Sequence, residues 1–263
     1  MISILRSVIV ALSTYSIIPM PQFEWKDKDL KYSMCAFPIV GVIIAVFSFF
    51  CYNLLRKYDC GASLIGGCMT LLPLFITGGI HMDGYMDTVD AISSYGDREK
   101  RLKILKDPHV GAFAVIGAIC YILLSYILWT ELTKRNMDGM ANDYSVYSVF
   151  SGYVISRVMS AIAVLKFKKA KNDGMVSDIS AAQDKGNIRV LVVMLIVLVI
   201  VILSVFKEEA FPLIIPSASM FVYYRNMSYK HFGGITGDLA GWFVQCCEII
   251  ILMMVLLSTL IRF

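Results

Sequence analysis

Apolar runs long enough to cross a lipid bilayer recur along this chain from its first residues to its last. A transmembrane helix needs about 20 mainly apolar residues, and inside a membrane the backbone must satisfy its own hydrogen bonds. The sequence therefore predicts an all-α fold, a polytopic membrane helix bundle with about seven or eight transmembrane segments. The candidate segments are approximately residues 2–19, 32–55, 61–80, 110–131, 144–166, 188–206, 210–224 and 239–261.

The composition leaves little room for a soluble domain. Of the 263 residues, 58% are hydrophobic and 17% are charged, and the mean hydropathy is +0.70. We therefore expect a single integral membrane domain over residues 1–263. The net charge of +4 suits a bilayer with anionic lipids better than nucleic acid, because no basic stripe with interleaved aromatic residues is visible. The seven cysteines lie mostly inside apolar runs without paired spacing, which is typical of small core residues.

Lysine and arginine are distributed unequally between the two alternating sets of connecting segments. Those at 20–31, 81–109, 166–187 and 225–238 contain 15 basic residues, whereas the other set contains 5. By the positive-inside rule, the first set is predicted to face the cytoplasm from the cell (inner) membrane. Eight crossings would place both chain ends outside. If residues 2–19 only dip into the membrane, the amino-terminal end would instead be cytoplasmic, and the sequence leaves both arrangements open.

Three carboxylates occur within eight residues of the stretch GGIHMDGYMDTVD, which runs from Gly78 to Asp90. Asp83, Asp87 and Asp90 have the spacing i, i+4, i+7, so a helix would place them on one face. Mg²⁺ is usually held by one or two carboxylates together with substrate phosphates. A solvated acidic stripe is the alternative. Because Asp is a poor helix former and like charges at i+4 repel, the pattern favours a metal or metal-phosphate site.

A basic stretch follows this acidic one. Arg98, Lys100, Arg101, Lys103 and Lys106 place five cations within nine residues. Arginine and lysine beside a metal site can hold the phosphate oxygens that the metal leaves uncompensated. For Lys100 and Lys103 we favour contact with anionic lipid headgroups. Arg98, Arg101 and Lys106 are the candidates for contact with a substrate diphosphate.

A second glycine-rich stretch, FGGITGD, leads into the last apolar segment. Gly233, Gly234 and Gly237 would allow backbone amides to approach a phosphate closely at a helix start. Asp238 could serve as the helix N-cap or as a further metal ligand. Glu248 falls on the same helical arc as Asp238, inside an otherwise apolar run, and an ionisable residue in a membrane helix is a candidate functional residue.

Arg157 is the other ionisable residue in the middle of a predicted membrane segment. A structural salt bridge between Arg157 and Glu248 is the alternative to a functional role for either residue. The three histidines, His81, His109 and His231, all fall on the predicted cytoplasmic face. A histidine there could act as general base on a hydroxyl nucleophile or hydrogen-bond a phosphate, and His81 is the best candidate for the base.

At these residues the chain resembles the cobalamin synthases, also called adenosylcobinamide-GDP ribazoletransferases. Order, spacing and overall length agree over essentially the whole chain. The sequence departs from the expected pattern at residues 168–174, where we would expect a proline before the glycine, and this leaves the role of 166–187 undecided. The matching stretches are Gly78 to Gly84 with Asp87 and Asp90, Arg98 to Arg101, Lys106-Asp107, Gly111, Gly233 to Asp238 with Gly241 and Glu248, and the opening Ser13 to Pro21.

The resemblance implies a Mg²⁺-dependent transferase with active-site loops 78–111 and 231–241. Its substrates would be adenosylcobinamide-GDP and α-ribazole or its 5′-phosphate, its product adenosylcobalamin or its 5′-phosphate, and GMP would be released. A homo-oligomer is compatible with the sequence. We assign the metal to Asp83, Asp87, Asp90 and Asp238, the diphosphate to Arg98, Arg101, Lys106, Gly233, Gly234 and Gly237, and catalysis to Asp83 and Asp87 with His81 as base.

Two other classes of function remain open from the residues alone. A CDP-alcohol phosphotransferase or a prenyltransferase would also use aspartates at i+4 spacing to hold a metal-diphosphate. The CDP-alcohol group typically has an Ala-Arg pair shortly after Asp-Gly, where this chain has Met86-Asp87. A transporter would use Arg157 and Glu248 as a substrate or proton path, but its acidic residues would more typically lie at mid-membrane depth in two repeated halves.

Overall fold

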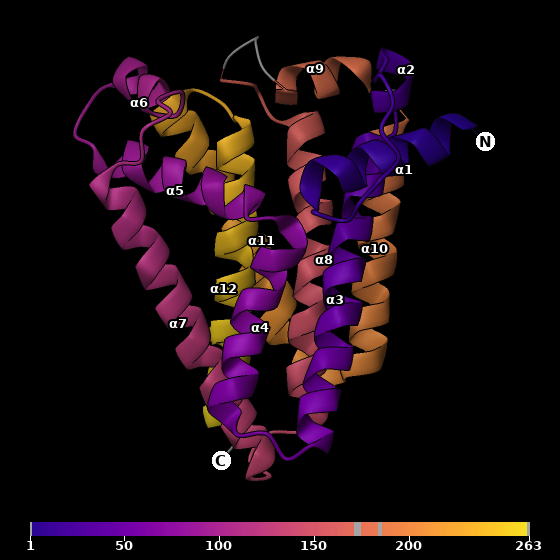
Figure 1. Ribbon diagram of the computed structural model, residues 1–263, viewed down its shortest axis with the longest axis vertical. Coiled ribbons are helices and arrows are strands. Elements are labelled where there is room, and N and C mark those ends of the chain that lie inside the picture. Colours follow the sequence, from indigo (N-terminus) through magenta and orange to yellow (C-terminus); the bar gives the residue numbers. More distant parts are fainter. Residues whose placement is uncertain (1, 171–174, 184–185, 262–263) are drawn as a thin grey trace.

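A computed structural model describes residues 2–170, 175–183 and 186–261, and within them the fold is an all-helical bundle (Figure 1). The predicted fold class is therefore confirmed. The β-type pairing found in the described part is one isolated parallel bridge between Lys169 and Ile235. The helices are α1 (Ile2–Tyr15), α2 (Asp27–Leu30), α3 (Ser33–Lys57), α4 (Ala62–Thr77), α5 (Ile80–Ser93), α6 (Arg98–Ile104), α7 (Ala112–Met137), α8 (Asp143–Lys166), α9 (Met175–Ala182), α10 (Asn187–Phe206), the 3-10 helix η1 (Lys207–Ala210), α11 (Phe211–Phe232) and α12 (Gly237–Ile261).

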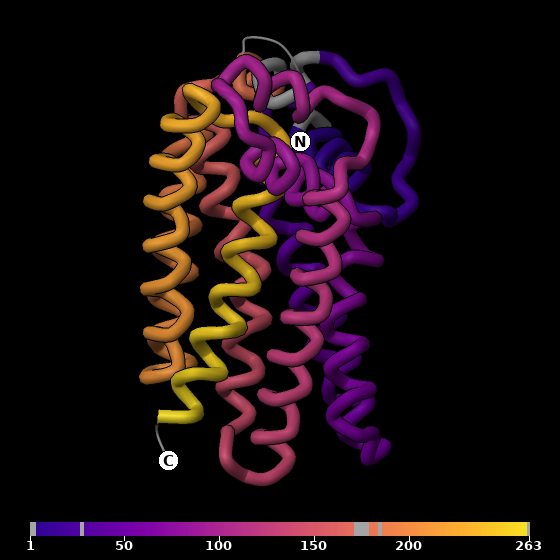
Figure 2. Tube along the Cα trace, turned by 90° about the vertical axis from the view of Figure 1, so that its left-hand side faces the viewer, coloured from indigo at the N-terminus to yellow at the C-terminus, as the bar shows by residue number. Residues whose placement is uncertain are grey.

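Five helical stretches in the described residues are long and apolar enough to cross a membrane, namely α3, α7, α8, α12 and the continuous 46-residue stretch from α10 through α11. The bent pair of α4 and α5 can be counted as a sixth. In the 46-residue stretch the chain reverses direction at η1 (Figure 2), so it contains both of the predicted segments 188–206 and 210–224. The predicted number of seven or eight crossings is thus approximate.

The sequence predicted a membrane-crossing segment at residues 2–19, but the helix found there is shorter than predicted. Helix α1 has 14 residues and ends at Tyr15, and at 1.5 Å per residue it spans about 21 Å, short of the ~30 Å hydrocarbon core. It lies at the same end of the bundle as α5 and α6, whereas α12 ends at the opposite end (Figure 1). The amide of Ile17 donates to the carbonyl of Ile76 at 3.0 Å, which ties the chain after α1 to the end of α4.

Helix α8 lies in the centre of the bundle. Within its most apolar window 78% of the residues are buried, compared with 11% in the α10–α11 stretch. The run of Val, Ile and Leu in α10 therefore faces outward from the bundle, where a membrane helix would contact lipid. Gly41 of α3 packs directly on the carbonyl of Tyr153 of α8, and such close backbone approach is a common way to pack helices in membranes.

Two consecutive glycines between α4 and α5 turn the chain sharply. Gly78 and Gly79 have φ angles of 62° and 79°, in the left-handed region that glycine adopts without steric cost. The axes of α4 and α5 consequently differ by 96°. Helix α5 therefore runs across the end of the bundle and not along it (Figure 1), where it meets the first turn of α12.

Candidate active site

The two motifs singled out in the sequence meet where α5 crosses α12. A methyl group added at Gly84 would lie 2.8 Å from both the Cα atom and the carbonyl oxygen of Asp238. Three residues further along α12, a methyl group at Gly241 would lie 3.2 Å from the carbonyl oxygen of His81. Small residues on both helices thus bring their backbones together, although about 150 residues of sequence separate the two motifs.

Helix α5 carries the three aspartates as the spacing predicted. Asp83 is exposed, and Asp87 and Asp90 are half-buried. Burial, followed by the charges of Asp83, Asp238 and Asp90, raises the pKa of Asp87 to about 6. The ionised form of Asp87 is therefore disfavoured by its surroundings, and a bound cation would relieve this cost.

Asp90 differs from the other two aspartates in its neighbour. Its carboxylate oxygens lie against Gly111, at the position that a side chain at Gly111 would fill. Gly111 is the residue before the first turn of α7, where a helix favours negative charge. Asp90 is also the weakest of the three influences on Asp87. Asp83 and Asp238 therefore act on Asp87 more strongly than Asp90 does.

Among the described residues, no three His, Cys, Asp or Glu side chains are arranged closely enough to enclose a metal ion. The predicted set of four Mg²⁺ ligands accordingly stays a prediction. The donors nevertheless suit this ion, because they are hard carboxylate oxygens with mutual repulsion that a cation would offset. Mg²⁺ also keeps several waters and takes substrate phosphates, so it does not require a complete protein cage.

The first turn of α12 is capped by Thr236. Its hydroxyl accepts a hydrogen bond from the amide of Leu239 at 3.2 Å, the usual capping contact. The same hydroxyl lies 3.3 Å from the carboxylate of Asp238. Of the two roles that the sequence allowed for Asp238, the N-cap is therefore taken by Thr236. The backbone of Asp238 lies against α5 at Gly84.

The glycines before α12 serve the local fold. The amides of Gly233 and Gly234 donate to the carbonyls of Tyr229 and Ser228 at 3.1 and 3.2 Å, which closes the end of α11. These two N–H groups therefore donate to carbonyls of the protein itself. The sequence had predicted that they would approach a phosphate, and it gave no sign of these internal hydrogen bonds. Gly237 is exposed at the first position of α12.

Sequence reasoning missed the segment from Lys168 to Ala170. Ile235 donates its amide to the carbonyl of Lys168 at 2.8 Å, and Ala170 donates to the carbonyl of Ile235 at 2.9 Å. A methyl group at Gly234 would lie 2.5 Å from this segment, so glycine is needed there. The basic residues of the segment are the one signal that could have pointed to it. Residues 171–174, where the resemblance departs, lie outside the described residues.

Two arginines of α6 contact the end of α11 and the loop after it. Arg98 donates to the carbonyl of Ala170 at 3.2 Å, and its guanidinium lies against Gly233. Arg101 has a side-chain nitrogen 2.6 Å from the imidazole of His231. Among the described residues, neither arginine forms an ion pair with a carboxylate. Positive charge without a carboxylate partner therefore lies at the same end of the bundle as the acidic α5.

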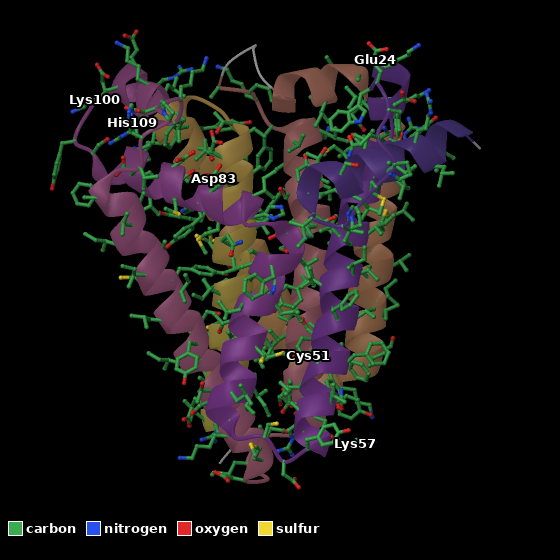
Figure 3. All side chains as sticks on the ribbon, in the orientation of Figure 1. Glu24, Cys51, Lys57, Asp83, Lys100 and His109 are labelled. Carbon is green, nitrogen blue, oxygen red and sulfur yellow. The ribbon has the colours of Figure 1, made fainter. Side chains whose placement is uncertain are left out.

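Figure 3 shows Asp83, Lys100 and His109 at this end of the molecule and Lys57 at the opposite end. Lys100 donates to the carbonyl of Tyr95 at 2.8 Å, and Lys106 is exposed. The acidic segment and the basic segment, which are neighbours in the sequence, therefore lie at the same end of the bundle.

His81, the predicted general base, is buried and only 4% exposed. Its ring lies 6.0 Å from that of Tyr15 and 5.6 Å from that of Phe37, between centroids. Neither ring nitrogen has a hydrogen-bond partner among the described residues. The assignment of His81 as base stays a prediction, and its buried ring lies beside the aromatic rings of Tyr15 and Phe37.

Arg157 and Glu248 form an ion pair inside the bundle, as the structural alternative predicted. Arg157 also donates to the carbonyl of Tyr153 at 2.8 Å, and the hydroxyl of Ser156 donates to Glu248 at 3.1 Å. Each charge is therefore compensated, and the pair joins α8 to α12 below the site.

Comparison with known proteins supports one family. A model of the cobalamin-5-phosphate synthase family matches residues 7–256. An adenosylcobinamide-GDP ribazoletransferase of Lachnoclostridium phytofermentans is 38% identical over 93% of this chain and 91% of its own length. Proteins of the same name from Clostridium perfringens and a Geobacillus species are 28% and 29% identical over 92% and 91% of this chain, and 94% and 91% of theirs. No solved structure matches the chain.

Proposed function

The chain belongs to the cobalamin-5-phosphate synthase family, and we propose that it joins adenosylcobinamide-GDP to α-ribazole or its 5′-phosphate with release of GMP. The observation that carries this proposal is the meeting of Asp83, Asp87 and Asp238 at one helix crossing, at the same end as two arginines without carboxylate partners. Carboxylates for a cation and cations for phosphate oxygens are the two needs of a diphosphate site.

The reaction is a displacement at one phosphorus of the diphosphate. A ribose hydroxyl of α-ribazole forms the new P–O bond, the bond between the two phosphates breaks, and GMP leaves with the electron pair of that bond. Because the 5′-phosphate is an alternative substrate, the attacking hydroxyl is one other than the 5′-hydroxyl. Its proton passes to a base, for which His81 is the candidate on α5.

Positioning and charge stabilisation supply most of the catalysis in such a displacement. Asp83, Asp87 and Asp238 would hold Mg²⁺, which supplies neutralisation of phosphate charge when bound. Asp90, directed toward Gly111, would support α5 from its far end. Arg98 and Arg101, with exposed Lys106, would contact phosphate oxygens, where arginine forms strong charge-assisted hydrogen bonds.

The site would face the cytoplasm from the cell membrane. The support is the 15-to-5 distribution of basic residues, because the rich set lies at the end that carries α5 and α6. The corrinoid substrate is large, and a site at the end of the bundle would be accessible to it from the aqueous side.

The alternative classes now have less support. Arg157 and Glu248, on which a transport path would depend, compensate each other. A CDP-alcohol phosphotransferase or prenyltransferase would share the carboxylates, but the family match favours a ribazoletransferase, and substrate use is the direct test.

The test is to incubate membranes containing the protein with adenosylcobinamide-GDP, Mg²⁺ and either α-ribazole or its 5′-phosphate. Mass spectrometry should detect GMP together with cobalamin or its 5′-phosphate, and chelation of Mg²⁺ by EDTA should abolish both. CDP-diacylglycerol and prenyl diphosphates serve as competing donors. Product from one of these, with none from adenosylcobinamide-GDP, would reject the proposal.

A further inference from the structure

Arg101 and His231, which are 130 residues apart in sequence, form one of the closest polar contacts at the site end of the bundle. A guanidinium nitrogen of Arg101 lies 2.6 Å from Nδ1 of His231. Arginine has only donors and does not lose its proton in proteins, so Nδ1 of the imidazole is the acceptor. The ring is therefore neutral, and its proton is on Nε2.

This contact leaves the positive charge of Arg101 uncompensated. Nε of Arg101 is buried without a hydrogen-bond partner among the described residues, and no carboxylate of the described part pairs with the guanidinium. One turn away, Arg98 donates to a backbone carbonyl. Buried donors and charges normally have a partner. An anion from outside the protein would supply the partner that Arg101 lacks within it.

Both partners are held in place by their own helices. Helix α6 is capped by Asp97, which accepts from the amide of Lys100 at 2.9 Å, and Leu102 anchors it in the core. His231 precedes the fully buried Phe232 at the end of α11. The contact thus joins two packed elements and is not an encounter of mobile side chains.

The helix ends offer a purely structural reason for part of this arrangement. Cations are favourable near the carboxyl end of a helix, and Arg98 and Arg101 both lie at the end of α11. This explains the location of positive charge but not the choice of an imidazole as partner. A carbonyl or carboxylate would satisfy an arginine as well, whereas a neutral imidazole adds an N–H donor on its other nitrogen.

We propose that Arg101 and His231 form one phosphate-recognition unit, in which Arg101 fixes the neutral Nε2–H tautomer and His231 donates that hydrogen bond to an oxygen of the diphosphate substrate. The inference rests on the proposed function for the nature of its ligand. It adds His231 to the binding residues and assigns its two nitrogens different tasks.

Two substitutions separate these tasks. His231→Asn keeps an acceptor near Nδ1 for Arg101 but lacks a donor at the Nε2 position, and His231→Gln places an amide donor near the Nε2 position. Because hydrogen bonds to charged groups are strong, His231→Asn should weaken binding of GDP, used as probe with Mg²⁺, by about 10- to 100-fold. His231→Gln should weaken it less, and His109→Asn, at an exposed histidine, should leave it unchanged.

A measurement on the wild-type protein tests the same inference if the variants fold poorly. Diethyl pyrocarbonate modifies accessible imidazoles, and mass spectrometry locates the modified histidine. GDP with Mg²⁺ should slow modification of His231 and not of His109. Wild-type GDP affinity in His231→Asn, or equal modification of His231 with and without GDP, would overturn the inference.

The binding experiments and the activity assay can fail separately, so they distinguish the phosphate-recognition unit from the proposed ribazoletransferase activity. Binding of GDP that depends on His231, without any cobalamin formed, would support the phosphate-recognition unit and reject the ribazoletransferase activity. Normal cobalamin formation with unchanged GDP affinity in His231→Asn would support the ribazoletransferase activity and reject the phosphate-recognition unit.

Discussion

Gly84 of α5 lies against the backbone of Asp238 of α12, with space for a hydrogen atom and not for a methyl group. This contact fixes the distance between the two motifs, because α5 cannot move toward or away from α12 without changing it. The absence of a side chain at residue 84 is therefore a feature of the site, although glycine itself performs no chemistry.

Gly84→Ala should reduce turnover at least tenfold while the protein still inserts in membranes. The added methyl group would lie 2.8 Å from Asp238, and overpacking of this kind costs about 1–3 kcal/mol or displaces the backbone. Turnover and Mg²⁺ dependence in membranes would be measured. Gly67→Ala is the matched control, because its nearest neighbour is a ring atom of Tyr126 at 3.9 Å. Unchanged turnover in Gly84→Ala would show that the close contact is not required.

Asp83→Asn and Asp87→Asn should each lower turnover by about 100-fold or more, because loss of a charged group at the reacting phosphate removes electrostatic stabilisation. Both changes preserve shape, so helical content and membrane insertion should be retained. Asp138→Asn removes the same charge at an exposed residue at the end of α7 and should have no effect. Wild-type rates for either α5 variant at saturating Mg²⁺ would contradict the metal assignment.

The sequence predicted those parts of the structure that depend on local periodicity. The helical face of Asp83, Asp87 and Asp90 follows from their spacing alone. The sequence also offered an Arg157–Glu248 salt bridge as the alternative to a functional role, because each is an ionisable residue in an apolar helix, and the structure contains this pair.

The parts that the sequence did not predict are contacts between distant loops. The bridge between Lys169 and Ile235 is made by backbone atoms, which carry no side-chain signature. The pairing of Arg101 with His231 depends on how α6 packs on α11, and neither residue determines this locally. The length of α1 was missed because the apolar run continues beyond Tyr15 into residues that are not helical.

Topology can be tested with one cysteine at each end of the bundle in a background without native cysteines. Tyr95 and Tyr58 are exposed to 95% and 70% at the end with the site and at the opposite end. A membrane-impermeant maleimide added to intact cells should label Tyr58→Cys and not Tyr95→Cys. Labelling of Tyr95→Cys should appear once the membrane is permeabilised. The reverse pattern would place the site outside.

Glu248→Ala should destabilise the protein by about 3–5 kcal/mol, because it leaves Arg157 buried and unpaired. Thermal unfolding in detergent is the measurement, and Glu208→Ala, at an exposed carboxylate, is the control. Replacement of both partners, Arg157→Met with Glu248→Leu, should recover most of the stability, since an apolar pair has no charge to bury. A double variant as unstable as Glu248→Ala would indicate a role beyond mutual compensation.

The final prediction concerns Asp83 and Asp238, which we expect to act on one metal from two helices. The structure brings α5 and α12 into contact at Gly84, and both carboxylates act on Asp87. Residues that share a ligand are coupled by about 0.5–3 kcal/mol, so their effects on rate should not add.

The Asp83→Ala and Asp238→Ala variants and their double variant form the cycle, with turnover measured over a range of Mg²⁺ concentrations. The double variant should be little slower than the slower single variant, because removal of either carboxylate already disables the shared site. Asp83→Ala combined with Asp138→Ala serves as the unlinked comparison and should show additive effects. Additivity for the Asp83 and Asp238 pair as well would mean that Asp238 acts on its own helix, and that the metal, if it binds, is held by α5 alone.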